Sequence, residues 1–560
     1  MSKKKAQPKT DGGAEPPLSR GVSPGHRPTF SAAHLVTDLI DLSKNYELRH
    51  GADSSGSTIF ARIPDGPDRG IVAVKCDRFR NHLRILGEQK LGRGPVPRVV
   101  DDVIAHIEAK GFQLPRHSIA KRIAHIDGAI YVDQGTATGE AIRIAPDGVA
   151  VVSDPPVLFS RNELTGILPV PEPGGDLELF ASHFPSVPPD AVPALVGFIV
   201  ASFIPIGAYP LLLLQGEHGC GKSMLTDAVR SIIDPVTGTG ARSSLPLKPE
   251  DLATLVGSSF LSSFDNTSRI SPDIADLLCK VSTGGTFETR RLYGQGEVYS
   301  LALHNPIIIN AIELPMNRPD LLSRVVAVDL ISLPDGIRTS EGNVRDRFSK
   351  DLPKLLGFIY KAVSLSLRDV QSTAVRPLPR LGDAAIFATA AEPALMLPDG
   401  AIVDAWDAAQ LGLTDDQVDC DPVVAVLSQL LQENGNQLEL NASQLSAMAE
   451  ELGAKEGNRL PRDFPGGAAK LGKYLKRNKS ILARAGICAE QSLRTKSQRG
   501  WKVTWNGTPR NAVRKTKVTR PAAHYPTPQD VLPPTSPNRI PKISTGDLCP
   551  STVGVMGAAA

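Results

Sequence analysis

Cysteine is scarce in this sequence: six residues in 560, none of them in a CxxC pair. This scatter supports neither a zinc ribbon nor a disulfide framework. Neither sign of charge dominates, since 62 Lys+Arg stand against 59 Asp+Glu and leave a net charge of +3. The overall charge therefore identifies no partner, and any basic surface has to come from local clustering.

Long apolar runs are almost absent as well. The N-terminal MSKKKAQPKTDGG is basic, but no apolar segment follows it, so it does not fit a secretory signal. Residues 191–214 are 24 residues without a charge, long enough to cross a bilayer. Because Pro205, Gly207 and Pro210 interrupt this run, it favours a buried helix followed by a buried parallel strand. We therefore expect a cytoplasmic protein with no membrane contact, in a reducing compartment.

The composition is that of globular protein, with 41% hydrophobic and 22% charged residues. At about 150 residues per domain, the length allows three or four domains. Patterning predicts disordered ends at 1–30 and 507–560, an N-terminal α/β accessory domain at 31–166 and an α/β core at 176–335. A helical region at 336–420 and a basic domain at 421–506 follow. Within the first domain, HLVTDLIDLSKNYEL predicts a helix and EAIRIAPDGVAVV a hairpin.

One segment of the core has the pattern GxxxxGK[ST] of a phosphate-binding loop. It lies between the strand-like residues 211–215 and the helical MLTDAVRSII, which is the setting that this motif requires. Lys222 is expected at the β- and γ-phosphates of ATP, and the Ser223 hydroxyl on Mg²⁺. The loop consists of Gly216, Glu217, His218, Gly219, Cys220, Gly221, Lys222 and Ser223.

Two later strand-like runs end in polar residues. The run SFLSSF at 259–264 leads into Asp265, which is the predicted second anchor for Mg²⁺. The run at 306–309 leads into Asn310, whose amide can position an attacking water. The alternatives are a turn or helix cap for Asp265 and an ordinary strand-end amide for Asn310.

The segment NRPDLLSRVVAVDL contains Arg318 and Arg324. A guanidinium here can reach the γ-phosphate in a neighbouring subunit and offset charge in the transition state. We favour this catalytic role for Arg324 over Arg318. The alternative for both is a surface ion pair with Asp320 or Asp329.

The order of these motifs resembles the superfamily 3 helicases, the AAA+-related P-loop ATPases of viral, phage and plasmid replication proteins. It is also similar to bacterial and mobile-element proteins described as ATP-binding or phage-primase-like. The resemblance is carried by the loop, the strand ending in Asp265, LLCKVSTGGTFETRRLY, PIIIN and RPDLLSRVVAV, and it extends more weakly over 35–505. It implies a P-loop core, ATP with Mg²⁺, a polar sensor at Asn310, an arginine acting in trans at Arg324, and a ring, most often a hexamer.

In this family a β-hairpin in the B′ region grips single-stranded DNA. Residues 286–293 and 297–303 are strand-like and joined by Gly-Gln-Gly, which predicts such a hairpin. Arg290 and Arg291 can meet a nucleic-acid backbone, and Tyr293 can stack on a base. An exposed hairpin with solvated arginines is the alternative.

The chain departs from the family at Asn266. Related ATPases place a second acid there as the general base, whereas an amide orients water but accepts no proton. Hydrolysis is then either slow or served by another acid, for which Glu217 and Glu288 are candidates.

Residues 459–503 hold twelve Lys+Arg and two Asp+Glu. Three helices followed by a basic strand pair suggest a winged-helix module that binds DNA. The alternative is a solvated charged face. The predicted contacts are Lys470, Lys473, Lys476 and Arg477.

The sequence thus favours a DNA-dependent, helicase-like ATPase for replication of a phage or mobile element. The second hypothesis is a nucleotide-gated DNA-binding protein with little or no hydrolysis, which Asn266 favours. A small-molecule kinase is a weaker third hypothesis, because it leaves Asn310, the hairpin and the basic module unexplained.

Overall fold

The computed structural model describes most of the chain between residues 32 and 519. The described residues are 32–53, 56–63, 71–117, 119–136, 138–162, 164–238, 242–290, 298–315, 318–333, 340–455, 460, 464–495, 498–507 and 517–519. Within these ranges, no helix has the length and apolar character needed to cross a membrane.

The centre of the fold is a parallel sheet of five strands in the order β12-β13-β16-β11-β17. Its strands are β11 (Leu211–Gln215), β12 (Ser243–Ser244), β13 (Ser262–Asp265), β16 (Ile307–Asn310) and β17 (Val325–Asp329). The predicted α/β class with a parallel sheet is therefore confirmed. Because all five strands run the same way, their carboxyl ends lie along one edge of the sheet.

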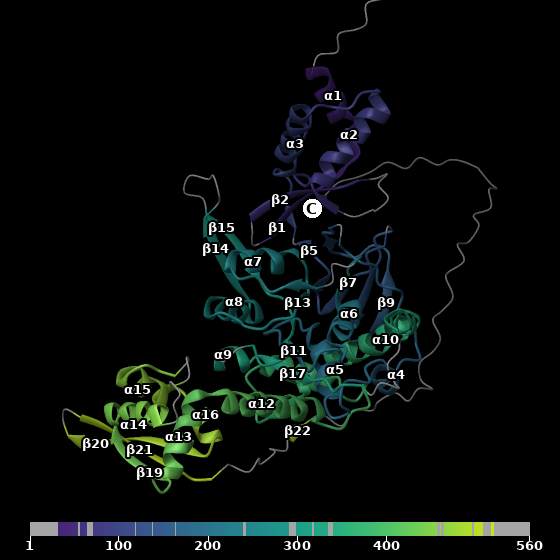
Figure 1. The fold of residues 1–560 in the computed structure, drawn as a ribbon. Helices are drawn as coiled ribbons and strands as arrows, with labels where there is room; N and C mark the ends of the chain where they lie inside the picture. The colour runs from purple at the N-terminus through teal and green to yellow at the C-terminus, as the bar shows by residue number, and fades with distance from the viewer. Residues whose placement is uncertain are drawn as a thin grey trace, which may run out of the picture. The chain divides into compact units, whose positions relative to one another are not determined.

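Helices cover both faces of this sheet, as the side chains of β11 show. Leu212 and Leu214 belong to one hydrophobic cluster, shared with α5 (Val192–Ala201), α6 (Lys222–Ile233) and α10 (Glu341–Asp369). Leu211 and Leu213 belong to a second cluster, with α7 (Pro249–Ser258) and α8 (Pro272–Thr283). In Figure 1, α7 and α8 lie to the left of β13 and α6 to its right.

The apolar run at 191–214 forms the predicted pair of elements. Helix α5 is buried over most of its length, and every residue of β11 is buried between parallel neighbours. The run is apolar because both of its elements lie inside the fold.

Most of the first described elements share a hydrophobic cluster of their own. The elements are α1 (Ala32–Leu42), η1 (Ser43–Asn45), β1 (Glu47–Asp53), β2 (Gly56–Arg62), β3 (Ile71–Ala73), α2 (Asp77–Leu91), α3 (Pro97–Gly111) and β4 (Arg116–His117). Of these, only η1 and β4 contribute no residue to the cluster. The helix predicted from HLVTDLIDLSKNYEL is correct only in its first part. Its last residues, from Glu47 on, instead form β1, because that strand pairs with β2 along its whole length.

A second sheet is antiparallel and joins the core. Its strands are β6 (Ile123–Ile126), β7 (Ala129–Asp133), β8 (Ala141–Ala145) and β9 (Gly148–Val152), and the last two form the predicted hairpin. The Ser364 hydroxyl of α10 donates to the Ala145 carbonyl at 2.6 Å. Ile130 and Ile144 share the cluster of α5 and α10. Short elements complete this part: β5 (Ile119–Ala120), β10 (Leu158–Phe159) and α4 (Leu177–Ser182).

After the core the chain is mainly helical until residue 420, as predicted. The elements are α10, η2 (Val370–Ser372), β18 (Ala374–Arg376), α11 (Gly382–Ala390) and α12 (Ala401–Cys420). The short helix α9 (Pro319–Leu322) lies earlier, between β16 and β17 of the core. Strand β22 (Lys517–Thr519) pairs with β18. The domain boundaries inferred from the sequence remain predictions.

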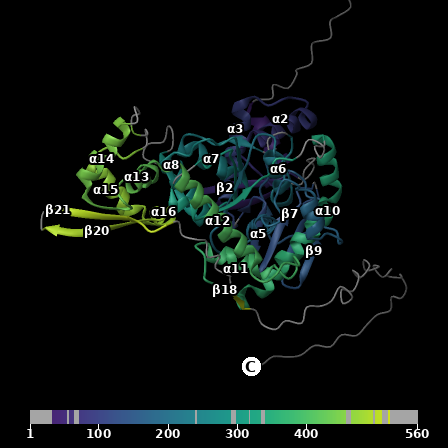
Figure 2. The same ribbon diagram turned by 60° about the horizontal axis from the view of Figure 1, so that its bottom comes forward.

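The last group of elements surrounds a third sheet, in the order β19-β21-β20. Its members are α13 (Pro422–Glu433), β19 (Gln437–Asn441), α14 (Ala442–Lys455), α15 (Ala468–Arg477), α16 (Lys479–Arg484), β20 (Ile487–Thr495) and β21 (Gln498–Trp505). These elements share one hydrophobic cluster, which includes Trp501. Figure 2 shows β20 and β21 side by side with α13, α14 and α15 next to them.

Candidate nucleotide site

The loop 216–223 connects the central strand β11 to α6. Its three glycines, Gly216, Gly219 and Gly221, have φ values of 143°, 81° and 92°, which side chains with a Cβ rarely adopt. A Cβ at Gly216 would also lie 2.7 Å from the Leu330 carbonyl oxygen. The backbone therefore curls tightly in front of the first turn of α6, the arrangement in which N–H groups can cradle an anion.

Lys222 is the first residue of α6 and reaches back over the loop. Its ammonium donates to the Gly216 carbonyl at 2.6 Å and to the Glu217 carbonyl at 2.8 Å. Two carbonyls thus hold the ammonium at the mouth of the loop, at the position from which it can meet phosphate oxygens.

Asp265 ends β13 and faces the loop from the same edge of the sheet. Its Oδ2 accepts a hydrogen bond from the Ser223 hydroxyl at 3.0 Å, and its Oδ1 accepts one from the Asn310 amide at 3.1 Å. Burial by itself would raise the pKa of Asp265, but the hydrogen bonds from Asn310, Ser223 and Arg242 outweigh it and lower the pKa. The carboxylate is therefore ionised at neutral pH.

Asn310 lies between the loop strand and the strand of Asp265, because β16 pairs with both β11 and β13. Its side chain is fully buried. The Thr226 hydroxyl of α6 donates to Asn310 Oδ1 at 2.8 Å, which leaves the amide nitrogen to point at Asp265. The structure thus brings together Lys222, Ser223, Asp265 and Asn310, four of the residues selected from the sequence.

The side chains at this edge fit a magnesium ion that is shared with a nucleotide. Ser223 and Asp265 supply a hydroxyl and a carboxylate in hydrogen-bond contact with each other. Mg²⁺ is usually held by one or two carboxylates together with phosphates, not by an all-protein cage. The described residues contain no group of three His, Cys, Asp or Glu that could hold a metal ion.

Arg242 also belongs to the site, although the sequence did not point to it. Its Nη1 donates to Asp265 Oδ2 at 2.6 Å, and its Nε lies 2.9 Å from Asp227 Oδ1 on α6. The residue precedes β12, the two-residue edge strand next to β13. A single arginine before so short a strand gives no recognisable pattern.

Asn266 stands at the position expected for a second acid, and the two candidate acids, Glu217 and Glu288, lie on the loop and on the hairpin. Asn266 is exposed, has a φ of 53° and donates its backbone N–H to Asp265 Oδ1 at 3.0 Å. Glu217 is exposed and accepts a hydrogen bond from the Ser332 hydroxyl at 3.1 Å. Glu288 is exposed on β14 (Gly285–Arg290).

Arg324 lies at the amino ends of the strands, whereas the loop lies at their carboxyl ends. Its carbonyl accepts from the N–H of Leu211, the first residue of β11, whereas Gly216 follows the last. With about 3.3 Å per residue, the five residues of β11 separate the two by roughly 15 Å. The guanidinium donates to the Asp320 carbonyl, and its buried Nε has no hydrogen-bond partner.

Arg318 forms ion pairs, which was the alternative to a catalytic role. It lies 2.7 Å from a carboxylate oxygen of Asp276 and 3.3 Å from one of Asp320.

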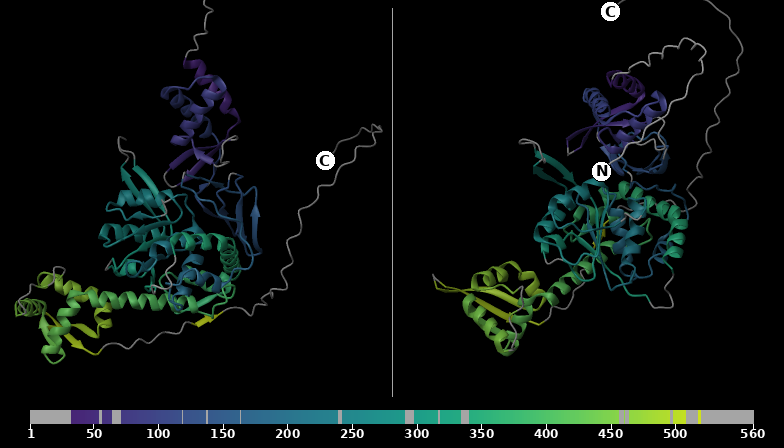
Figure 3. Two further views of the ribbon diagram at one scale, coloured as in Figure 1. Left: turned by 45° about the vertical axis from the view of Figure 1, so that its right-hand side comes forward. Right: turned by 45° about the horizontal axis from the view of Figure 1, so that its top comes forward.

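The predicted hairpin is present. Strand β14 pairs antiparallel with β15 (Val298–Leu303), and both views of Figure 3 show the pair standing out from the neighbouring helices. Arg291 and Tyr293 lie outside the described residues, and Arg290 is described for its backbone alone. Their predicted contacts with DNA therefore remain predictions.

The basic helix α15 has one buried and one exposed face. Leu471 and Leu475 are fully buried against the cluster of the third sheet. All four predicted contact residues are exposed: Lys470, Lys473, Lys476 and Arg477. The cations therefore form one surface that no described part of the chain covers.

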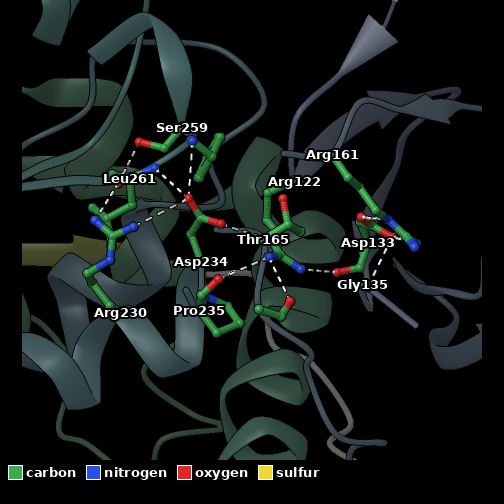
Figure 4. Close-up of polar contacts among 12 residues, drawn as sticks. Arg122, Asp133, Gly135, Arg161, Thr165, Arg230, Asp234, Pro235, Ser259 and Leu261 are labelled. Carbon is green, nitrogen blue, oxygen red and sulfur yellow. Dashed lines mark hydrogen bonds and ion pairs between the residues drawn. The ribbon is translucent and has the colours of Figure 1, made fainter. Parts of the chain in front are cut away.

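A buried network holds the far ends of α6 and β13 (Figure 4). The Arg122 side chain, 1% exposed, donates to Asp234 at the end of α6 at 2.9 Å. It also donates to the carbonyls of Asp133, Gly166 and Pro235, at 2.7, 2.9 and 3.1 Å. One guanidinium thus joins the second sheet, the segment that follows it, and α6.

Asp234 extends the network to β13. Its Oδ2 accepts the backbone N–H groups of Phe260 and Leu261, both at 3.1 Å. Arg230 donates to the Leu261 carbonyl at 2.7 Å and to the Ser263 hydroxyl at 3.2 Å. Helix α6 begins at Lys222 and β13 ends at Asp265. The Asp234 carboxylate therefore holds the end of each element that lies away from the loop.

Part of the chain matches a known protein family. Residues 184–416 match the model of a family described as the actinomycete integrative conjugative element replication protein. This range contains the whole parallel sheet and the loop, and it ends within α12. A search of curated proteins found no match.

Two solved structures are similar over most of the chain. One is described as "SCCmec type IV Cch - active helicase", with 12% identity and a TM-score of 0.43 over 82% of this chain and 93% of its own. The other is the apo structure of the NrS-1 C-terminal region, with 12% identity and a TM-score of 0.37 over 85% of this chain and 99% of its own.

Proposed function

We propose that this protein is a DNA-dependent ATPase that acts as a helicase-like motor in the replication of a mobile element. The observation that carries the proposal is the convergence of Lys222, Ser223, Asp265 and Asn310 at the carboxyl edge of one parallel sheet. The family match over residues 184–416 supports the replication context.

In this proposal the loop 216–223 binds the phosphates of ATP, with Lys222 at the β- and γ-phosphates. Ser223 and Asp265 would hold Mg²⁺, which would supply positive charge to offset the charge of the phosphates. Thr226 and Asp265 hold Oδ1 and one amide N–H of Asn310 in place, so its second N–H is the group that would orient the attacking water.

The position of Arg324 favours action in trans. Roughly 15 Å separates it from its own loop, farther than an arginine side chain reaches. In a ring, most simply a hexamer, the same arginine would face the nucleotide of the next subunit.

DNA would contact the hairpin β14–β15 and the exposed cations of α15. Residues 422–505 run in the order helix, strand, three helices and two strands. The proposal interprets this order as a winged-helix module with one additional short helix, α16. Single-stranded DNA is the substrate that a channel hairpin would grip.

The second candidate, a nucleotide-gated DNA-binding protein, is favoured by Asn266. The exposed amide beside Asp265 can hold a water but accepts no proton. ATP would then control assembly on DNA, and hydrolysis would be negligible.

Both candidates require nucleotide control of DNA binding. We expect the full-length protein to bind single-stranded DNA more tightly with ATP and Mg²⁺ than with ADP or no nucleotide, measured by fluorescence anisotropy. Lys222→Ala should lose this difference. If Lys222→Ala loads onto DNA as well as the wild type, or if nucleotide makes no difference to the wild type, both candidates are wrong.

A further inference from the structure

All hydrogen-bonding positions of the Asp265 carboxylate are occupied. Asn310 Nδ2 and the Asn266 N–H donate to Oδ1, at 3.1 and 3.0 Å. Ser223 Oγ and Arg242 Nη1 donate to Oδ2, at 3.0 and 2.6 Å. A carboxylate offers about four acceptor positions. No position is left for Mg²⁺ or for a water bound to it.

Of these four donors, Arg242 is the one that can leave without moving an element of the fold. The amide of Asn310 is fully buried in the sheet, the Asn266 N–H belongs to the backbone, and Ser223 lies in the first turn of α6. Arg242 reaches Asp265 through a long side chain that is 30% exposed.

The guanidinium also occupies the place of a cation. It lies between two carboxylates, with Nη1 2.6 Å from Asp265 and Nε 2.9 Å from Asp227, which is one turn after Ser223 on α6. The contacted oxygen of Asp265 is the one that also faces the Ser223 hydroxyl. A divalent ion held by Ser223 and Asp265 would therefore compete with Arg242 for the same oxygen and repel it.

We propose that Arg242 is a positioning residue that competes with Mg²⁺ for Asp265. It holds Oδ2 while the loop is free of nucleotide and releases that oxygen when Mg²⁺ enters with the nucleotide. The ion pair with Asp227 keeps the released guanidinium beside the loop. This proposal rests on the proposed nucleotide site and adds a reason for the site to remain closed to metal alone.

The test compares the affinity of a fluorescent ADP analogue in EDTA and in Mg²⁺, since ADP allows no turnover. We expect Arg242→Gln to lower the dissociation constant in Mg²⁺ about tenfold, the low end of what neighbours of metal ligands contribute, and to leave it unchanged in EDTA. Arg242→Lys keeps the charge but cannot bridge two carboxylates as the planar guanidinium does. Its dissociation constant in Mg²⁺ should therefore fall by less than that of Arg242→Gln. It also serves as the second variant if Arg242→Gln does not fold.

Lys248→Gln is the matched control, because it removes one exposed positive charge six residues further on. It should change neither constant. An unchanged or weaker affinity of both Arg242 variants in Mg²⁺ would overturn the proposal while leaving the nucleotide site intact. A wild type that binds the analogue in neither condition would overturn the nucleotide site itself.

Discussion

At the scale of single residues, Asn266 sets what the site can do with water. It directly follows Asp265, the proposed anchor for Mg²⁺, and its φ of 53° turns the chain so that its N–H returns to the Asp265 carboxylate. Asn and Asp are the residues that adopt this backbone most readily after Gly. An acid can therefore be placed here without straining the turn.

Asn266→Asp should raise the rate of ATP hydrolysis at least about tenfold, because it supplies a proton acceptor beside the nucleotide. Nucleotide affinity should stay within about twofold, since Lys222 and the loop are unchanged. The measurement is steady-state hydrolysis together with analogue binding.

Asn266→Gly is the control for that variant, because it keeps the backbone and supplies no acid. It should not increase the rate. Equal rates for Asn266→Asp and the wild type would mean that another acid, such as Glu217 or Glu288, already serves.

At the scale of elements, the sequence predicts strands and their ends well but not the contacts between distant side chains. Asp265 and Asn310 could be selected because apolar runs mark buried parallel strands, and the residues after such strands meet at one edge. Arg242 could not, because its contact depends on which strand forms the edge of the sheet. Arg122 follows Lys121 in a basic pair that looks exposed, yet it is buried against Asp234, 112 residues away.

The Arg122 network should be worth much more to stability than an exposed ion pair. Arg122→Met leaves Asp234 buried without its cation and should lower the free energy of unfolding by about 3–5 kcal/mol. Chemical denaturation measures this loss.

Arg143→Met is the comparison, since it removes an arginine of β8 whose partner, Asp147, is exposed. Its denaturation midpoint should stay at the wild-type value. Similar midpoints for the two variants would show that the network does not hold α6 and β13.

At the scale of the whole molecule, the charge is nearly balanced but is distributed unevenly. Twelve Lys+Arg gather within residues 459–503 of a chain whose net charge is +3. The exposed face of α15 presents four of them. Contacts between such cations and phosphates release counterions, so DNA binding through this face should weaken steeply with salt.

Removing two of these cations should flatten that salt dependence. For Lys473→Ala/Lys476→Ala we expect weaker binding of single-stranded DNA and a slope of log affinity against log salt that is smaller by about 1.4, or 0.7 per lost phosphate contact. Fluorescence anisotropy at several salt concentrations gives the slope.

The matched double variant is Lys350→Ala/Lys361→Ala, which removes two exposed lysines from α10. It should keep the wild-type slope. If the salt slope of both double variants falls by the same amount, the exposed face of α15 is only a solvated charged face.

The central claim is that this chain couples nucleotide turnover to DNA, and steady-state ATP hydrolysis tests it most directly. Wild type and Lys222→Ala would be compared with and without single-stranded DNA, at low and high salt. We predict turnover that DNA stimulates, that high salt reduces to the unstimulated rate, and that Lys222→Ala lowers at least about 100-fold. ATP binding without turnover, whether DNA is present or not, would contradict the motor and leave the nucleotide-gated DNA-binding protein in its place.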